Sequence, residues 1–209
     1  MNKLDKRKSP IAIEEEIEKT AKDIFDEFKQ FTDGFRVLFL IQRHKEGGET
    51  NNSHLRKIVT RNKKEYLKAF QELVRDKITS ELPFRIYASL NERNFNKAIH
   101  KFKYEQLDAD LFHQEQKENF YLDLKNRFIG CLMQPSQRAS SLFLFDIDKD
   151  DDFKDTTAGT LAVIPSEHIV KLYPTKNGWH LITRPFDYTK IVLPKNCEFK
   201  KDALLLLSF

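Results

Sequence analysis

An apolar run that ends in two carboxylates is the feature that most constrains this chain. Residues 141–148 read Ser-Leu-Phe-Leu-Phe-Asp-Ile-Asp, and a short apolar run of this length is typical of a buried strand. Side chains of a strand alternate between its two faces, so Asp146 and Asp148 are expected to project from the same face. Unpaired buried carboxylates are costly, and the usual solutions are a divalent cation, a basic partner or exposure at the end of the strand. A metal site is therefore the leading hypothesis.

The composition is that of a globular protein with a sizeable core. The chain has 209 residues, of which 40% are hydrophobic and 18 are Phe. Cys131 and Cys197 are its two cysteines and form no CxxC pair, which argues against a disulfide framework or a zinc finger. The polar N-terminus and the lack of an apolar run of roughly 18 residues favour a soluble, cytoplasmic protein without a membrane partner. A net charge of +4 allows a polyanionic partner without requiring one.

Hydrophobic periodicity and turn residues predict an α+β fold. Helices are expected over about 20 residues after Ser9-Pro10, over Lys63–Ile78, and from Asn91 to about Phe128 with a break near residues 108–113. Strands are expected over Phe35–Ile41, Phe84–Leu90, Leu142–Asp148, Ile169–Tyr173, Trp179–Thr183 and Ala203–Leu207. In this prediction one domain spans residues 1–209, and its helical and α/β half over 1–140 packs on a mostly antiparallel sheet over 141–209.

A second constellation lies in the hairpin from Tyr173 to Thr183. Both residues of Asn177-Gly178 tolerate positive φ, which is typical of a tight hairpin turn. Lys176 and the backbone amides of the turn can contact phosphate, and Gly178 would let a ligand approach the backbone closely. His180 follows the turn and can donate to a phosphate oxygen. An intervening strand or helix can bring this hairpin and the two acids to one face of the sheet.

Spacing separates the known kinds of DxD site. An EF-hand loop starting at Asp146 needs Gly at its sixth position and Glu at its twelfth, where Asp151 and Thr157 stand. A haloacid dehalogenase-like phosphatase opens with a similar strand, but it needs a larger downstream region than the 61 residues that follow Asp148. Two alternatives stay open. One is the DxD of a glycosyltransferase, and the other is a pair of acids that only cap an acidic loop.

Together these motifs resemble the archaeo-eukaryotic primase superfamily, the catalytic core of primases and primase-polymerases. The family's hydrophobic strand ending in DxD matches Leu142–Asp148, and its small-residue turn followed by histidine matches Thr175–His180. Its third motif is one more acid, for which Asp202 is the candidate because it precedes the last apolar strand. The resemblance covers residues 141–207. It implies an RRM-like sheet on which the catalytic acids Asp146, Asp148 and Asp202 hold Mg²⁺ or Mn²⁺, while His180, Lys176 and Gly178 bind the nucleotide.

By this resemblance the chain is a divalent-metal-dependent nucleotidyltransferase acting on nucleoside triphosphates and a single-stranded DNA or RNA template, with a helicase or another DNA replication protein as a partner. Arg85 and Tyr87 share one strand face, and Arg93 follows in the next loop. Arginine forks and tyrosine rings suit a nucleic-acid backbone and its bases. Two other classes stay open: a non-catalytic nucleic-acid-binding replication accessory protein with the same fold, and a metal-dependent phosphoesterase that uses water as the nucleophile.

Overall fold

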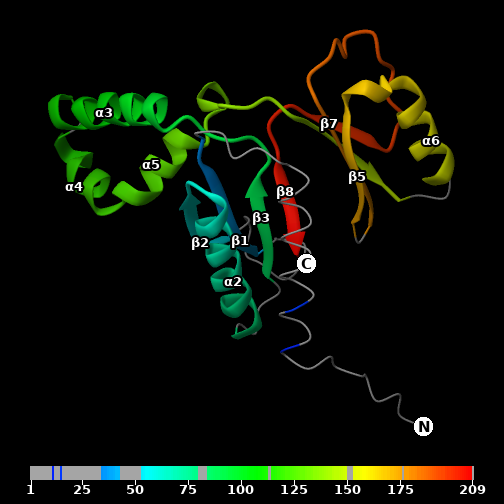
Figure 1. The fold of residues 1–209 in the computed structure, drawn as a ribbon. Coiled ribbons are helices and arrows are strands. Elements are labelled where there is room, and N and C mark those ends of the chain that lie inside the picture. Colours follow the sequence, from blue (N-terminus) through cyan, green and yellow to red (C-terminus); the bar gives the residue numbers. More distant parts are fainter. Residues whose placement is uncertain are drawn as a thin grey trace. The chain divides into compact units, whose positions relative to one another are not determined.

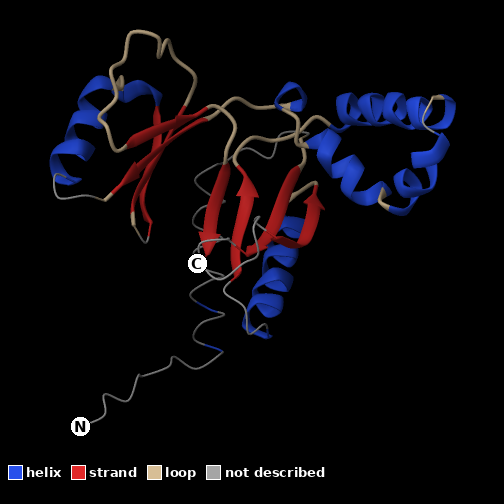
Figure 2. Ribbon diagram, turned by 180° about the vertical axis from the view of Figure 1, so that it is seen from behind, coloured by secondary structure: helices blue, strands red, loops and turns tan. Residues whose placement is uncertain are grey.

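The structure is a computed structural model that describes residues 11, 15, 34–42, 53–79, 84–112, 114–149, 153–175 and 177–208. These residues form an α+β fold with two four-stranded antiparallel sheets (Figures 1 and 2). The chain divides into two compact units. The first consists of Met1–Gln30, Leu38–Tyr87 and Leu206–Phe209, and the second of Phe31–Val37 and Ala88–Leu205. The expectation of one domain with a division near residue 140 stays a prediction. Most of the helix expected after Ser9-Pro10 lies outside the described residues.

The first sheet has the strand order β2-β1-β3-β8. Its strands are β2 (Ser53–Thr60), β1 (Arg36–Gln42), β3 (Phe84–Ser89) and β8 (Leu204–Ser208). Helix α2 (Lys63–Thr79) runs along one face of this sheet (Figure 2). The helix begins at a reciprocal cap, because Asn62 Oδ1 accepts from the Glu65 amide while Glu65 accepts from the Asn62 side chain. Its buried residues follow the helical period: Tyr66, Ala69, Phe70, Leu73 and Val74.

Three helices follow β3 in the second unit: α3 (Phe95–Leu111), α4 (Gln114–Leu122) and α5 (Leu124–Leu132). Asn94 caps α3, since its side chain accepts from the Lys97 amide. The predicted break in the helix near residues 108–113 is confirmed, because α3 ends at Leu111. The helical region is interrupted a second time at Asp123, between α4 and α5. Phe102 of α3 packs against Phe120 and Phe128, with ring centroids 5.7 Å apart in both pairs.

The second sheet has the order β5-β6-β4-β7, and all of its pairs are antiparallel. Its strands are β5 (Ile169–Thr175), β6 (Gly178–Thr183), β4 (Phe143–Asp148) and β7 (Cys197–Lys200). One face of β4 enters a hydrophobic core with Ile164, which follows helix α6 (Phe153–Val163), and Leu181 of β6. Short 3₁₀ turns at Pro135–Gln137 and Ser166–His168 precede β4 and β5.

Several predicted elements are confirmed, and one strand lies in another sheet than expected. The predictions for β1, α2, β3, β4, β5 and β6 hold to within two residues, whereas β2, β7 and α6 were missed. The last apolar strand exists as β8, but it pairs with β3 instead of joining the sheet that carries β4. The pairing starts early, because the Leu90 amide donates to the Ala203 carbonyl. No helix among the described residues is long and apolar enough to cross a membrane.

Gly178 lies so close to β4 that a side chain would overlap the neighbouring backbone. A Cβ atom at this position would collide with the Ile147 carbonyl and lie 3.1 Å from the Asp148 Cα. We expect Gly178→Ala to lower the free energy of unfolding by about 2 kcal/mol or more, since backbone atoms must move. Urea denaturation followed by circular dichroism measures this change.

Gly130 of α5 provides the matched control for that measurement. Apart from its chain neighbours and the backbone of its own helix, no atom lies within 4 Å of a Cβ added at Gly130. Alanine also suits a helix better than glycine, so Gly130→Ala is expected to raise the unfolding free energy by about 0.5–1 kcal/mol. Equal stabilities of Gly178→Ala and the wild type would show that β6 does not need glycine there.

Candidate functional site

A row of polar side chains crosses all four strands of the second sheet. In the observed registers Asp146 of β4 is paired with His180 of β6 on one side and with Glu198 of β7 on the other. His180 is in turn paired with Tyr173 of β5. Directly paired residues of antiparallel strands point to the same face of a sheet. Tyr173, His180, Asp146 and Glu198 therefore share one face, and we call them the polar row.

This polar face lies on the side of β4 that does not enter the core. Phe145 and Ile147 point into the core on the other face, where they meet Ile164. On the polar face, exposure rises along the strand: Leu144 is 1% exposed, the Asp146 side chain 28%, and Asp148 is exposed. Asp148 is two residues beyond Asp146 and so lies on the same face. Both acids are therefore accessible to solutes, and Asp148 more so.

Both ring nitrogens of His180 have partners. The Nδ1 atom lies 2.7 Å from the Tyr173 hydroxyl, and Nε2 lies 3.3 Å from Asp146 Oδ1. A carboxylate accepts hydrogen bonds only, so Nε2 carries the proton that faces Asp146. In the neutral ring Nδ1 then accepts from the Tyr173 hydroxyl. Tyr173 and Asp146 together fix the orientation of a buried imidazole.

Lys200 of β7 neutralises the acids of the polar row. Its ammonium donates to Asp146 Oδ2 at 2.9 Å and lies 2.8 Å from Glu198 Oε2. The hydrogen bond from His180, with a smaller one from Lys200, lowers the pKa of Asp146 to about 2 although burial opposes this shift. Burial alone would lower the pKa of Lys200, but its pairs with Glu198 and Asp146 outweigh burial and raise it. Both groups are charged at neutral pH.

The chemistry of the polar face suits a hard divalent cation. Asp146, Asp148 and Glu198 offer carboxylate oxygens, the ligands preferred by Mg²⁺ and Mn²⁺. No group of three or more His, Cys, Asp or Glu side chains within the described residues stands ready to hold a metal ion. The ammonium of Lys200 bonds two of these carboxylates, so a divalent cation there would compete with it for the same oxygens.

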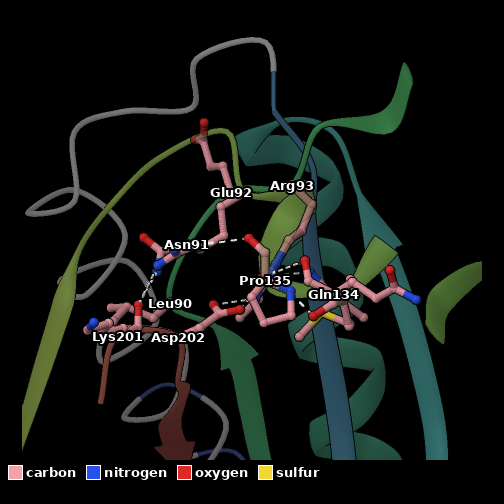
Figure 3. Close-up of polar contacts among 12 residues, drawn as sticks. Leu90, Asn91, Glu92, Arg93, Gln134, Pro135, Lys201 and Asp202 are labelled. Carbon is pink, nitrogen blue, oxygen red and sulfur yellow. Dashed lines mark hydrogen bonds and ion pairs between the residues drawn. The ribbon is translucent and has the colours of Figure 1, made fainter. Parts of the chain in front are cut away.

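Asp202 has a different partner. Arg93 binds both carboxylate oxygens of Asp202, with Nη2 2.6 Å from Oδ1 and Nη1 2.9 Å from Oδ2 (Figure 3). The Arg93 side chain is 1% exposed and that of Asp202 14%. The Nη1 atom also donates to the carbonyls of Met133 and Gln134 at 3.3 and 3.4 Å. The described contacts thus tie Asp202 to Arg93 and not to the polar row, where we had expected it.

Asn91 joins the segments that lead into β4 and out of β7. Its Nδ2 donates to the carbonyls of Lys201 (Figure 3) and Leu142. Its Oδ1 accepts from the Leu142 amide at 2.6 Å. Arg138 reinforces the same point by donating to the Lys201 carbonyl at 2.9 Å. Asn91 is fully buried. These bonds fix where β4 begins and where β7 ends, and so they help to set the position of the polar row.

The remaining predicted residues lie in varied surroundings. Gly178 packs against the β4 backbone, and Lys176 lies outside the described residues. Arg85 and Tyr87 are half-buried on one face of β3, whereas the guanidinium of Arg93 is buried in its ion pair. Sequence reasoning missed three members of the site. These are Glu198, Lys200 and Tyr173. The alternation Cys-Glu-Phe-Lys over 197–200 is a signal for the first two, because it predicts a short strand with Glu198 and Lys200 on one face. No comparable pattern marks Tyr173 as part of the site.

Comparisons with protein-family models, with curated proteins and with solved structures found no match. The interpretation of the site therefore rests on its own geometry. The face carries three carboxylates, an oriented histidine and a shared lysine on strands β4, β6 and β7. Such a set can hold a cation by its acids and contact an anion through His180 and Lys200.

Asp202 is expected to matter for folding. Replacing it by Asn leaves the buried Arg93 charge without its counter-charge, so we expect Asp202→Asn to lower the unfolding free energy by about 3–5 kcal/mol. Asp187→Asn is the matched control, because Asp187 is exposed and its bonds among the described residues go to Thr189 in its own turn. Urea denaturation of both variants tests the difference. A loss below about 1 kcal/mol for Asp202→Asn would contradict a structural role for the pair.

Asp146 is expected to make stability depend on acid pH. Its folded-state pKa of about 2 lies below the ordinary value of 3.8. The stabilisation from its ionised form is therefore complete above pH 4 and is lost as the pH falls through 2, a change of about 2 kcal/mol. Unfolding free energies measured from pH 5 to pH 2 should fall less steeply for Asp146→Asn than for the wild type. Identical slopes would show that Asp146 is not held ionised by His180 and Lys200.

Proposed function

We propose that the chain is a divalent-metal-dependent nucleotidyltransferase of primase-polymerase type, which acts on nucleoside triphosphates and a single-stranded template. The polar row is the observation that carries this proposal. It places His180 and Glu198 on either side of Asp146, on three adjacent strands, and Asp148 follows on the same face. A histidine held between a hydroxyl and a carboxylate suits phosphate chemistry, whereas two acids that only cap a loop would not need it.

In this proposal Asp146, Asp148 and Glu198 would hold Mg²⁺ or Mn²⁺. We assign the third carboxylate to Glu198 because it is paired with Asp146 in register, whereas the Asp202 carboxylate is bonded by Arg93. A divalent ion held there would make the attacking hydroxyl more nucleophilic and stabilise the leaving pyrophosphate. The protein's own contribution is to fix the three carboxylates on two strands whose registers are set by β-pairing.

His180 and Lys200 are assigned to the nucleotide. Phosphate oxygens are repelled by a row of carboxylates, and hydrogen-bond donors beside the acids offset that repulsion. The Nε2–H of His180 faces Asp146 and would become available to a phosphate when a metal ion takes that carboxylate, while Tyr173 holds the ring in place. Lys200 supplies an ammonium that becomes available to a phosphate when a metal ion takes its carboxylates. Lys176 and Gly178 remain part of this proposal through their place at the turn before His180.

The nucleic-acid partner is proposed to meet the face of β3 that carries Arg85 and Tyr87. Both side chains are half-buried and share a face through the alternation of the strand. A guanidinium and a phenol ring suit a phosphate backbone and an unstacked base. Arg93 is not included, since its guanidinium is buried and its two terminal nitrogens are bonded to Asp202 and to two carbonyls.

One observation favours the competing class, a nucleic-acid-binding protein without catalysis. Lys200 neutralises two of the three acids, and the described residues contain no preformed group of three metal ligands. A fold that had lost its metal could keep such a lysine as a permanent counter-ion. Activity and metal binding measured on the same variants separate the two classes.

The test is template-directed incorporation of labelled nucleotides in the presence of Mn²⁺. We expect Asp148→Asn and Glu198→Gln each to lower the rate by about 100-fold or more, the loss typical when a group that stabilises the transition state is removed. Glu167→Gln is the control, because Glu167 is an exposed acid in the Ser166–His168 turn, outside the polar row. Mn²⁺ binding, followed by electron paramagnetic resonance, should weaken in the first two variants and not in the third.

Each alternative has its own outcome in this experiment. Binding of oligonucleotide without incorporation, together with no binding of Mn²⁺, would support the accessory protein. Release of phosphate without incorporation would support the phosphoesterase. Full activity of Glu198→Gln, with activity lost in a folded Asp202→Asn variant, would return the third carboxylate to Asp202.

A further inference from the structure

Helix α3 is apolar on two opposite faces, and the described residues cover only one of them. Ala98 and Ala109 are buried on the inner face, where Phe102 packs against α4 and α5. On the outer face Tyr104 is 72% exposed and Leu107 53%. Leu111, one turn further along, is 57% exposed. Single exposed apolar residues are ordinary, but a contiguous stripe of them indicates a binding surface.

The outer stripe has the spacing of a coiled-coil seam. With Tyr104 and Leu111 at a positions, Leu107 is at d, and the seam extends back to His100 at d. The buried Ala98 and Ala109 fall at b and f, on the far side of the helix, so the two faces do not overlap. The seam therefore fits a partner helix without disturbing the packing of α3 on its own unit.

The charges beside the seam run against the helix dipole. Lys101 and Lys103 lie in the first half of α3, while Asp108 and Asp110 lie in the second half. The first turn of α3 has no acidic residue and the last turn has no basic one. Acids near the N-terminus and bases near the C-terminus stabilise a helix, so this arrangement does not serve the isolated helix. It does serve a helix that lies antiparallel to an identical one.

We propose that α3 forms a homodimer interface, with the helix of a second copy packed antiparallel along the stripe of Tyr104, Leu107 and Leu111. Lys101 and Asp108 occupy successive e positions, and e positions face each other in an antiparallel pair. Lys101 of each copy then meets Asp108 of the other, and the two contacts are related by the two-fold axis. The g positions, Lys103 and Asp110, are complementary in the same way. This surface is independent of the polar row and of the proposed activity.

The existing ion pairs of these residues are compatible with the dimer. Lys101 lies 3.6 Å from Glu105 on its own helix, and Asp110 lies 3.0 Å from Lys117 of α4. Exposed pairs of this kind contribute little to stability, so they give way to or share a contact with a second copy at little cost. The e-position pair of Lys101 and Asp108 is the one to test, because both residues lie on α3 itself and are exposed.

Oligomeric state gives the first test. Light scattering coupled to size exclusion, with the full chain at about 1 to 100 μM, should show a mass that rises from 24.8 kDa toward twice that value. Leu107→Asp places two charges in the seam and should weaken association by about tenfold or more. Val192→Asp is the matched control, since Val192 is 86% exposed and lies outside α3. Circular dichroism should show unchanged helix content in both variants.

A charge swap tests the orientation of the two helices. Lys101→Glu alone creates two like-charged contacts in the antiparallel dimer, and so does Asp108→Lys alone, so each variant should be monomeric. An equimolar mixture of the two variants should associate again, because every contact in the mixed dimer is then between opposite charges. The double variant should also dimerise.

Two results would overturn the proposal. One is a wild type that stays at 24.8 kDa over the whole concentration range, which would show that the stripe does not bind a second copy. The other is a dimer that Leu107→Asp leaves intact or that mixing of the single variants does not restore. The first result leaves the polar row and its activity assay untouched, so the two proposals fail separately.

Discussion

Strand β4 is paired along both edges, and this double pairing is the constraint on which the candidate site depends. Its register with β6 sets His180 beside Asp146, and its register with β7 sets Glu198 on the other side. A slip of one residue in either pair would move a whole strand's side chains to the opposite face. The site is therefore not a property of two neighbouring acids in the sequence. It exists because three strands are held in one alignment, to which the close contact of Gly178 with β4 and the bonds of Asn91 contribute.

The buried guanidinium of Arg93 imposes a second constraint. A charge that is 1% exposed needs a counter-charge and partners for its N–H groups, and Asp202 with two backbone carbonyls provides most of them. Its Nε has no hydrogen-bond partner among the described residues. Because both terminal nitrogens of this buried guanidinium bond Asp202, Arg93 fixes the position of the Asp202 carboxylate. The ion pair consequently fixes the turn between β7 and β8 and occupies both carboxylate oxygens of Asp202.

The elements that depend on local interactions could be predicted from the sequence, and those that depend on pairing between distant segments could not. Strand β4 and the β5-β6 hairpin were predictable because an apolar run and an Asn-Gly turn are local signals. Strand β7 was missed because it has four residues, two of them charged, and such a segment resembles a turn until it pairs with β4. The sheet to which β8 belongs was wrongly predicted for a related reason. The apolar residues of β8 suit either sheet, and only its long-range pairing with β3 decides which sheet it joins. The burial of Arg93 contradicts the usual exposure of arginine, so no local pattern could have shown it.

Electrostatics links the folded state of the polar row to what it can bind. Carboxylates on adjacent strands repel each other, and like charges directly across a sheet destabilise it. His180 and Lys200 remove this repulsion from Asp146 and Glu198, so the sheet can form without any metal ion. The same two groups then compete with a divalent ion for the carboxylates. The ion must therefore bind these carboxylates more strongly than the Lys200 ammonium does. In the proposed function a nucleotide would change this balance, because its phosphates could take over the lysine and histidine donors that the acids release. Metal and nucleotide are therefore expected to bind this face more strongly together than separately, a coupling built from side chains already in contact.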